Sequence, residues 1–438
     1  MPADSANAHA IQEAITRLNT PDYDRWAAQI RRSNACRNPI HLRGHVTHYN
    51  AAGEPIRHYT TRTEPNGLLR IPCKTRRASR CPACAETYRT DTFHLIRAGL
   101  IGGKGVPESV STHPCLFVTL TAPSFGLVHT RRERAGRLAP CRTRRNAPTC
   151  PHGRVMSCAT KHEREGGCLG HPLCPGCYDY AGTVLFNAIC PLLWKRLTDA
   201  TRRQLAKSGG LTLTELRHHA TLSFAKVAEY QKRGVVHFHA ITRLDGPTGP
   251  TTPPPNWATA DVLAHAVRHA AQAVSATIPS YDDQPARTLR WGTQLDIRPI
   301  TVHGNLTEQA VAAYVAKYAT KAAECVGTLD QRLSPLTELA TLPIHDHARR
   351  LITACFSLGE IDELAHLNLT HWAHMLGFGG HFSTRSRHFS LNLGTLRQLR
   401  QDHASDLPEG GYTMAHWLYA GQGLTTGEKL LATSVGAR

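Results

Sequence analysis

The sequence predicts an α+β fold in which helices flank a central antiparallel sheet. Residues 221–230 and 235–244 are rich in apolar and β-branched residues, a composition typical of strands. The polar segment between them, Gln-Lys-Arg-Gly, is typical of a hairpin turn. The remaining strands and helices do not alternate strictly, and this favours an α+β arrangement over a parallel α/β sheet.

Other elements are expected on both sides of this hairpin in the chain. Residues 116–121 (LFVTLT) are a short apolar run that ends at Ala-Pro-Ser, the pattern of a buried strand. Asn305 and Glu308 match a capping box that would begin a helix over 305–324. We also expect a helix over 178–205, an Ala-rich helix over 259–278, a strand over 290–300, and mostly helical structure beyond 330, interrupted at 377–387.

The chain of 438 residues is strongly basic, with 51 Lys and Arg against 33 Asp and Glu and a formal net charge of +18. The arginines gather at 76–80, 131–145 and 385–400. Guanidinium groups pair with phosphates and release counterions, so this pattern favours a nucleic-acid partner. The alternative is a basic protein that binds no nucleic acid. No apolar run reaches the roughly 20 residues of a membrane span, and no secretion signal is evident, so we expect a cytoplasmic protein without membrane contact.

Fourteen cysteines in a cytoplasmic chain favour metal sites over disulfides. Two pairs, Cys81-x-x-Cys84 and Cys174-x-x-Cys177, each supply half of a tetrahedral zinc site. Cys36 and Cys73 are the natural partners of the first pair. For the second pair we choose Cys150 and Cys158 from a larger set that includes Cys141, His152, His162 and Cys168. Two structural Zn²⁺ ions are therefore expected, with free or redox-active thiols as the alternative.

A second metal motif lies on the predicted hairpin. His237 and His239 are two residues apart on a strand, so both project from one face and could bind one divalent ion. Glu229 lies eight positions earlier, across the hairpin, and could add a carboxylate oxygen. Such a mixed ligand set suits Mn²⁺, or Mg²⁺ with substrate oxygens. The alternative is a solvated strand face with two polar residues.

Two tyrosines share a face of the helix expected over 305–324. Tyr314 and Tyr318 are four residues apart, and Lys317 and Lys321 have the same spacing on an adjacent face. A nearby cation and a metal-polarised phosphate would help a tyrosine attack as a nucleophile, because its unperturbed pKa is about 10. The alternative is an aromatic stripe in the core.

Together these motifs resemble those of the HUH endonucleases. Residues 116–121 are similar to the family's first strand, which ends in Thr-Leu-Thr, and His237-Phe238-His239 to its histidine motif. The spacing of Glu229 resembles that of geminivirus-type Rep proteins. The helix with Tyr314 and Tyr318 resembles the two-tyrosine helix of isometric phage gene A proteins.

The chain as a whole resembles the RepSA-type replication initiators of actinobacterial plasmids. The resemblance rests on the two Cys-x-x-Cys segments, residues 228–239, residues 314–321 and the Gly-rich segment 377–387. It implies a 96–330 nicking domain interrupted by a Cys/His-rich insertion at about 130–177. A Cys/Arg-rich zinc-binding region that contacts DNA (1–95) would precede this domain. A mostly helical accessory DNA-binding region (331–438) would follow it.

The resemblance also implies an activity. An ion held by Glu229, His237 and His239 would polarise a phosphate of the plasmid origin, in a single strand or hairpin. Tyr318 would attack first, giving a 5′-phosphotyrosine and a 3′-OH primer for rolling-circle replication. Tyr314 would act later, and Lys317 or Lys321 would stabilise charge. A host helicase and DNA polymerase would then act on the nicked origin, because the chain lacks a phosphate-binding GxxxxGK[ST] loop.

Two other functions remain open on the sequence. A relaxase or transposase of the same superfamily would use the same chemistry, although relaxases usually place the tyrosine motif before the histidines. A non-catalytic zinc-dependent DNA-binding regulator would leave the spacing of the Glu, His and Tyr residues without a role.

Overall fold

A computed structural model describes residues 2–164, 166–300, 307–319, 331–335, 339–404 and 411–436. The chain forms two compact units, one made of residues 1–92 and 392–438 and the other of residues 93–391. The sequence instead predicted three consecutive regions. The difference arises because the last 47 residues of the chain supply a strand and helices to the first unit, whereas residues 331–391 pack with the central unit.

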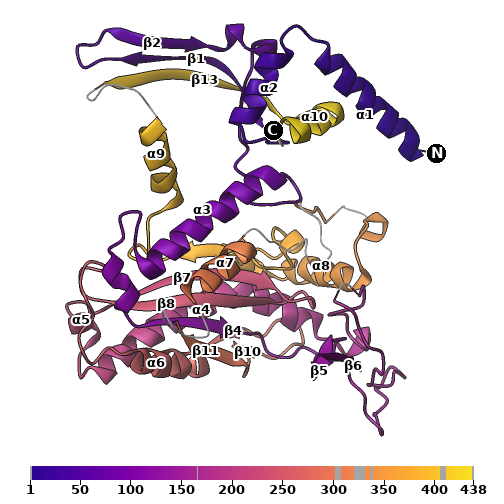
Figure 1. The fold of residues 1–438 in the computed structure, drawn as a ribbon. Helices are drawn as coiled ribbons and strands as arrows, with labels where there is room; N and C mark the ends of the chain where they lie inside the picture. Colours follow the sequence, from indigo (N-terminus) through magenta and orange to yellow (C-terminus); the bar gives the residue numbers. More distant parts are fainter. Residues whose placement is uncertain are drawn as a thin grey trace. The chain divides into compact units, whose positions relative to one another are not determined.

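The first unit is built on a small antiparallel sheet with strand order β13-β1-β2, in which β3 also pairs with β1. The strand β13 comes from the C-terminal region that the sequence predicted to be mostly helical, and it pairs with β1 along its whole length (Figure 1). Helices α1, α2 and α10 pack together around Trp26. The elements of this unit are α1 (Pro2–Leu18), α2 (Tyr23–Arg32), β1 (Ile40–Tyr49), β2 (Pro55–Thr60), β3 (Leu69–Ile71), α9 (Leu393–Ala404), β13 (Tyr412–Gln422) and α10 (Thr426–Gly436), and α3 (Pro82–Ile101) begins here.

The second unit contains the central sheet, five antiparallel strands in the order β11-β4-β8-β7-β12. This arrangement confirms the α+β class and the expected hairpin. The edge strand β12 lies within the Gly-rich segment 377–387. The strands of the sheet are β4 (Cys115–Leu120), β7 (Thr221–Tyr230), β8 (Val236–Asp245), β11 (Leu295–Pro299) and β12 (Ser383–Arg385). The remaining elements are β5 (Arg132–Arg134), β6 (Arg137–Ala139), α4 (Tyr180–Ser208), α5 (Leu213–Leu216), α6 (Ala260–Ala273), β9 (Ser275–Ile278), β10 (Arg287–Arg290), α7 (Glu308–Ala319) and α8 (Asp346–Gly359).

Helices lie on both faces of the central sheet. On one face, Trp194 of α4 contacts Phe238 of β8, and α6 packs beside α4. On the other face, Tyr314 of α7 contacts His239 of β8. Because side chains alternate along a strand, His237 and His239 face α7 while Phe238 is buried in the core beneath α4. No helix among the described residues is long and apolar enough to cross a membrane.

Three predicted boundaries were wrong. The helix expected over 259–278 ends at Ala273, because residues 275–278 pair with β10 as strand β9. The strand expected over 290–300 is split into β10 and β11 by Gly292, whose added Cβ would lie 2.5 Å from the Ala122 carbonyl oxygen. The helix expected over 305–324 begins at Glu308, because Thr307 precedes it and its hydroxyl accepts from the Ala310 N–H. Asn305 and the expected end at 324 lie outside the described residues.

A cluster of buried charged residues lies at the C-terminal end of β8. Arg243 and Asp245 are fully buried and form an ion pair of 2.7 Å between Nε and Oδ1. His113 and Ser223 also contact the Asp245 carboxylate. Burial opposes ionisation of Asp245, but the contacts with His113 and Arg243 outweigh it and lower the pKa of this carboxyl. Arg243 further donates to the carbonyls of His388 and Phe389, so the cluster joins strand β8 to the segment that follows β12.

Replacing Asp245 by Asn should lower the free energy of unfolding by about 3–5 kcal/mol, because the Arg243 guanidinium stays buried without its counter-charge. Urea unfolding followed by circular dichroism measures this change. The control is Asp199→Asn, whose carboxylate pairs with Lys195 and Arg202 at the surface and should contribute less than about 1 kcal/mol. Similar losses in the two variants would contradict this account of the cluster.

Candidate active site

The hairpin of β7 and β8 sets the geometry of the candidate active site. Its register places Glu229 directly opposite His237, with His239 two residues further along the same face. Glu229 Oε2 lies 3.0 Å from His237 Nε2 and 3.1 Å from His239 Nε2. The structure thus brings together the three residues that the sequence singled out as ligands of a divalent ion.

These spacings fit a bound ion. In octahedral coordination with bonds of about 2.1 Å, neighbouring donor atoms lie about 3.0 Å apart. Two imidazole nitrogens and a carboxylate oxygen form a set that suits Mn²⁺, or Mg²⁺ that also takes substrate oxygens. The three donors come from adjacent strands and lie on one face of the sheet.

Strand β4 orients one of these ligands. Thr119 lies directly opposite His239, and its Oγ1 is 3.1 Å from His239 Nδ1. When Nδ1–H donates to Thr119, the lone pair of Nε2 faces Glu229 and the ion position. Phe117, on the same face of β4, stacks on the His239 ring at 5.7 Å. His237 Nδ1 is buried and has no hydrogen-bond partner among the described residues.

The protonation states favour metal binding. Burial opposes ionisation of Glu229, but its contacts with the imidazoles of His237 and His239 outweigh burial and lower the pKa of this carboxyl to about 2. Burial also lowers the pKa of His239, against the effect of its hydrogen bond to Glu229. An ionised carboxylate and a neutral imidazole are the forms that bind a cation.

Helix α7 carries both tyrosines to this centre. Tyr314 Oη lies 3.1 Å from His239 Nε2, and the Tyr318 ring packs 4.6 Å from that of Tyr314 and 5.9 Å from that of His239. Burial raises the pKa of both tyrosines, and the charge of Glu229 raises each further. A hydrogen bond with Glu229 also raises the pKa of Tyr318, so both hydroxyls are close to the ligands of the candidate metal centre.

Of the two lysines near these tyrosines, the structure describes Lys317 but not Lys321. Lys317 is exposed, and its Nζ lies 5.7 Å from the centre of the Tyr318 ring. Lys321 lies outside the described residues. Arg164, from the Cys/His-rich insertion, is a further cation near this helix, since its charge lowers the pKa of Tyr318 against the stronger effect of burial.

Sequence reasoning missed two charged residues on the same sheet face. Strand β11 pairs with β4 so that Asp296 lies opposite Thr119 and Arg298 opposite Phe117. Asp296 and Arg298 form an ion pair of 2.9 Å, and the Asp296 charge favours protonation of His239. Their position depends on the pairing of strands far apart in the chain, whereas the role of Thr119 could have been inferred from alternation along its strand.

A four-cysteine group lies in the first unit. Cys36, Cys73, Cys81 and Cys84 offer sulfur atoms within 4.8 Å of one another, as the sequence proposed. The Cys36 and Cys81 sulfurs are 3.8 Å apart, the separation expected in a tetrahedron with Zn–S bonds of about 2.3 Å. A contact with Cys81 raises the pKa of Cys36 to about 12 in the metal-free thiols, so a zinc ion would have to displace that proton.

The insertion holds two Cys/His groups where the sequence predicted one. Cys150, Cys174 and Cys177 lie together with His152, while Cys158 lies apart from them. Cys158 joins His129, Cys141 and His162 in a second group, in which Cys158 Sγ is 3.4 Å from His162 Nε2. The choice of Cys158 over His152 failed because spacing alone does not show how a loop-rich segment folds back. Three groups among the described residues therefore have ligands suited to zinc.

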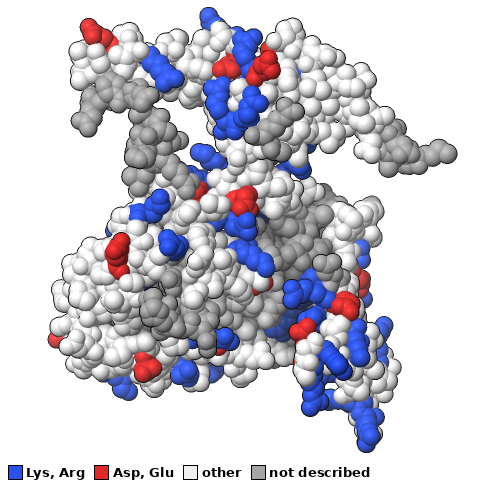
Figure 2. Space-filling view, viewed as in Figure 1, with Lys and Arg blue, Asp and Glu red and all other residues white. Residues whose placement is uncertain are grey.

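The insertion is also a concentrated source of positive charge. Figure 2 shows Lys and Arg side chains gathered over the region of β5 and β6, where the segment 131–145 supplies seven arginines. Loops this rich in like charge have little apolar surface to hold them together. Metal ligands at both ends of the segment would offset that repulsion and fix the arginines in place.

Comparison with known proteins identifies the family of the chain. Residues 22–437 match the family described as RepSA, replication initiator protein, pSAM2. A replication initiator protein from Streptomyces ambofaciens is 48% identical over 454 residues, a match that covers 99% of this chain and 94% of that protein. No solved structure matches the chain significantly. The sequence and the family match together place the chain in the RepSA family of replication initiator proteins.

Proposed function

We propose that the chain initiates rolling-circle replication by nicking one strand of a plasmid origin through tyrosine transesterification. The observation that carries the proposal is the convergence of the Tyr314 and Tyr318 side chains on the Glu229/His237/His239 group. If the two tyrosines only packed in the core, no group of metal ligands would be needed beside them. A regulator that only binds DNA would need neither the two tyrosines nor the Glu229/His237/His239 group.

The reaction assigns a role to each residue. A divalent ion bound by Glu229, His237 and His239 would supply Lewis-acid polarisation of the scissile phosphate. The Tyr318 oxygen attacks phosphorus as its proton leaves, and the bond from phosphorus to the 3′ oxygen breaks. That oxygen takes up a proton and becomes the 3′-OH primer, while the 5′ end stays linked to Tyr318. Because one ester replaces another, the strand can later be religated.

The neighbouring side chains complete this proposal. Tyr314 would attack the regenerated junction and release the displaced circle, since its hydroxyl contacts His239. Lys317, beside the Tyr318 ring, would stabilise the tyrosinate, and Lys321 is proposed for the same role on the sequence alone. The DNA partner would be single-stranded or hairpin origin DNA, and a host helicase and polymerase would follow.

The three Cys/His groups are proposed to bind structural Zn²⁺. Each offers four sulfur or imidazole ligands, as in closed structural sites, with no carboxylate. Zinc there would order loop segments that cannot bury enough apolar surface alone.

Replacing Tyr318 by Phe should abolish the covalent protein–DNA adduct, because the attacking oxygen is removed. Full-length protein is incubated with labelled single-stranded origin DNA and Mn²⁺, and the adduct is resolved on a denaturing gel. Tyr314→Phe should still form the adduct but fail in the second strand transfer, and Tyr281→Phe, which lies outside the site, should behave as the wild type. An adduct at the wild-type level in Tyr318→Phe would refute the assignment of the first nucleophile.

Replacing Thr119 by Val should weaken Mn²⁺ binding about 10- to 100-fold, because His239 loses the acceptor that fixes its orientation. Isothermal titration calorimetry of the zinc-loaded protein measures this affinity. The matched control is Thr242→Val on strand β8, since the Thr242 hydroxyl has no partner among the described residues and lies on the opposite sheet face. Equal Mn²⁺ affinity in Thr119→Val and the wild type would show that Thr119 does not position the ligand.

The purified chain should contain three Zn²⁺ ions, one for each Cys/His group, as measured by inductively coupled plasma mass spectrometry. Cys158→Ser should lose one ion, because Cys158 belongs to the group with His129, Cys141 and His162. Cys168→Ser should retain all three, because Cys168 contacts His162 but belongs to none of the groups. If the wild type holds only two Zn²⁺ ions and Cys158→Ser holds the same two, the group that contains Cys158 does not bind zinc.

A further inference from the structure

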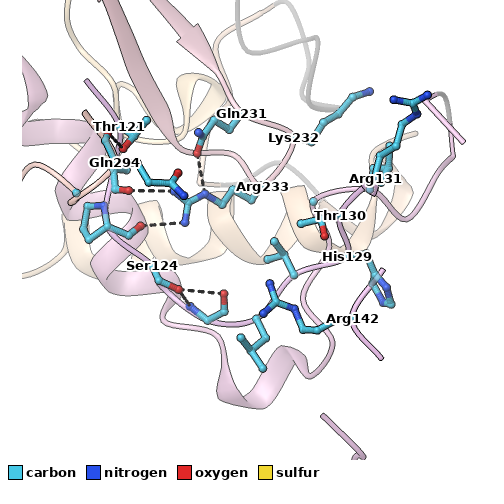
Figure 3. Close-up of a pocket in the computed structure, with 18 of the residues that line it drawn as sticks. Thr121, Ser124, His129, Thr130, Arg131, Arg142, Gln231, Lys232, Arg233 and Gln294 are labelled. Atoms are coloured by element: carbon cyan, nitrogen blue, oxygen red, sulfur yellow. Dashed lines mark hydrogen bonds between the residues drawn. The ribbon is translucent and has the colours of Figure 1, made fainter. Parts of the chain in front are cut away.

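A cavity of 680 Å³ opens at the end of the central sheet that carries the hairpin turn (Figure 3). Three parts of the sheet region line it: residues 121–124, which follow β4, the turn residues 231–233, and residues 292–294 before β11. The Cys/His-rich insertion supplies the facing wall. The cavity is within the range of volumes that bind small organic ligands, about 300–1,000 Å³.

The cavity adjoins the candidate active site. Thr121 follows Thr119, which contacts His239, by two residues, and Gln231 follows Glu229 by two residues on the neighbouring strand. A strand rises about 3.3 Å per residue, so this rim begins about 7 Å from the ligands of the proposed metal ion. If a DNA single strand were bound with its scissile phosphate at the ion, the next one or two nucleotides would reach the cavity.

The wall supplied by the insertion is firmly built. The Gly170 N–H donates to the His129 carbonyl at 2.9 Å, and the Leu173 N–H to that of Leu127 at 2.9 Å. Gly170 has φ +85°, and a Cβ there would lie 2.2 Å from the Lys232 carbonyl carbon, so the insertion packs tightly on the hairpin turn. His129 also belongs to a candidate zinc group, which would fix this wall further.

The lining combines an apolar surface with cations. Pro123, Leu127, Val128 and Leu169 give it apolar area, and Arg131, Arg142 and Lys232 contribute positive charge. Figure 3 shows the Arg142 side chain extending into the space between Ser124 and Thr130, with Lys232 and Arg131 toward one rim.

The Arg142 guanidinium lacks part of its hydrogen bonding among the described residues. Its Nε is buried without a hydrogen-bond partner among the described residues, and so is that of Arg131. A buried N–H without an acceptor is destabilising, and a phosphate oxygen is an acceptor that suits a guanidinium. Arg233 differs, because its guanidinium donates to the carbonyls of Ala122 and Pro123 and thereby holds the end of β4.

We propose that this cavity binds one unstacked nucleotide of the single strand beside the scissile phosphate. Its base lies against the apolar wall, and its phosphate is bound by Arg142, with Lys232 at the rim. The assignment rests on the proposed nicking function, and it gives the insertion a direct part in holding the strand that is cut.

The first test measures binding of a fluorescein-labelled oligothymidylate of about 20 nucleotides by anisotropy, with full-length protein and no Mn²⁺. Arg142→Ala should weaken binding about tenfold, and Lys232→Ala by a smaller factor. The control is Arg134→Ala, an exposed arginine of β5 in the same insertion but outside the cavity lining, which should change binding by less than about twofold. The zinc content of each variant shows whether the insertion is still folded. Because Lys232 lies outside the insertion, weaker binding in Lys232→Ala reports the loss of a DNA contact and not the loss of the insertion fold.

The second test locates the nucleotide. Origin strands with a single 4-thiothymidine at successive positions are cross-linked by light, and the attached peptide is identified by mass spectrometry. Positions within one or two nucleotides of the nick should cross-link to the peptide that contains Leu127 and Val128. Cross-links of these positions elsewhere, together with unchanged binding in Arg142→Ala and Lys232→Ala, would overturn the assignment.

The two proposals fail separately. If the wild type forms the covalent adduct while Arg142→Ala binds and cross-links as the wild type does, only the cavity assignment is wrong. If the wild type forms no adduct with its own origin strand, the nicking function is wrong, and the binding loss in Arg142→Ala then decides whether the cavity holds single-stranded DNA.

Discussion

The register of the β7–β8 hairpin is the constraint on which the candidate site depends. Glu229 of β7 is paired with His237 of β8. If one strand shifted by one residue relative to the other, the side chains of that strand would move to the opposite face of the sheet. Burial of Phe238 and Ala228 beneath α4 fixes this register, because the same shift would expose them. The apolar core on one face therefore places the candidate metal ligands on the other face. Strand β4 then adds Thr119, and helix α7 adds the two tyrosines.

Much of this arrangement was predictable because it is local in sequence. The hairpin, the pairing of Glu229 with two histidines two residues apart, and the i, i+4 tyrosines follow from short periodicities. The α+β class was also predicted correctly, and the four cysteines chosen for the first zinc site lie together. The position of Asp296 and Arg298 was not, because it depends on pairing between β11 and β4, which are about 175 residues apart in the chain. The contribution of β13 to the first unit was missed for the same reason.

In the Cys/His-rich insertion, bound metal ions would hold the chain together in place of a hydrophobic core. The described residues of the insertion form only two short strands and one turn of 3-10 helix, yet eight Cys and His residues fall into two compact groups. Sequence spacing left several pairings open, and only the folded chain separates Cys158 from Cys150, Cys174 and Cys177. The same segment carries Arg142 into a cavity beside the site and Arg164 close to Tyr318. The insertion, which interrupts the second unit in sequence, thus lines a cavity beside the candidate site.

The most direct test of the central claim is the identity of the residue that carries DNA after reaction. Trypsin cuts after Lys317, so Tyr314 and Tyr318 fall in different peptides. The protein is reacted with its origin strand and Mn²⁺, digested with nuclease and trypsin, and the nucleotide-bearing peptide is identified by mass spectrometry. We predict a 5′-linked nucleotide on Tyr318-Ala-Thr-Lys321. A nucleotide on a residue outside helix α7, or on no peptide at all, would contradict the account.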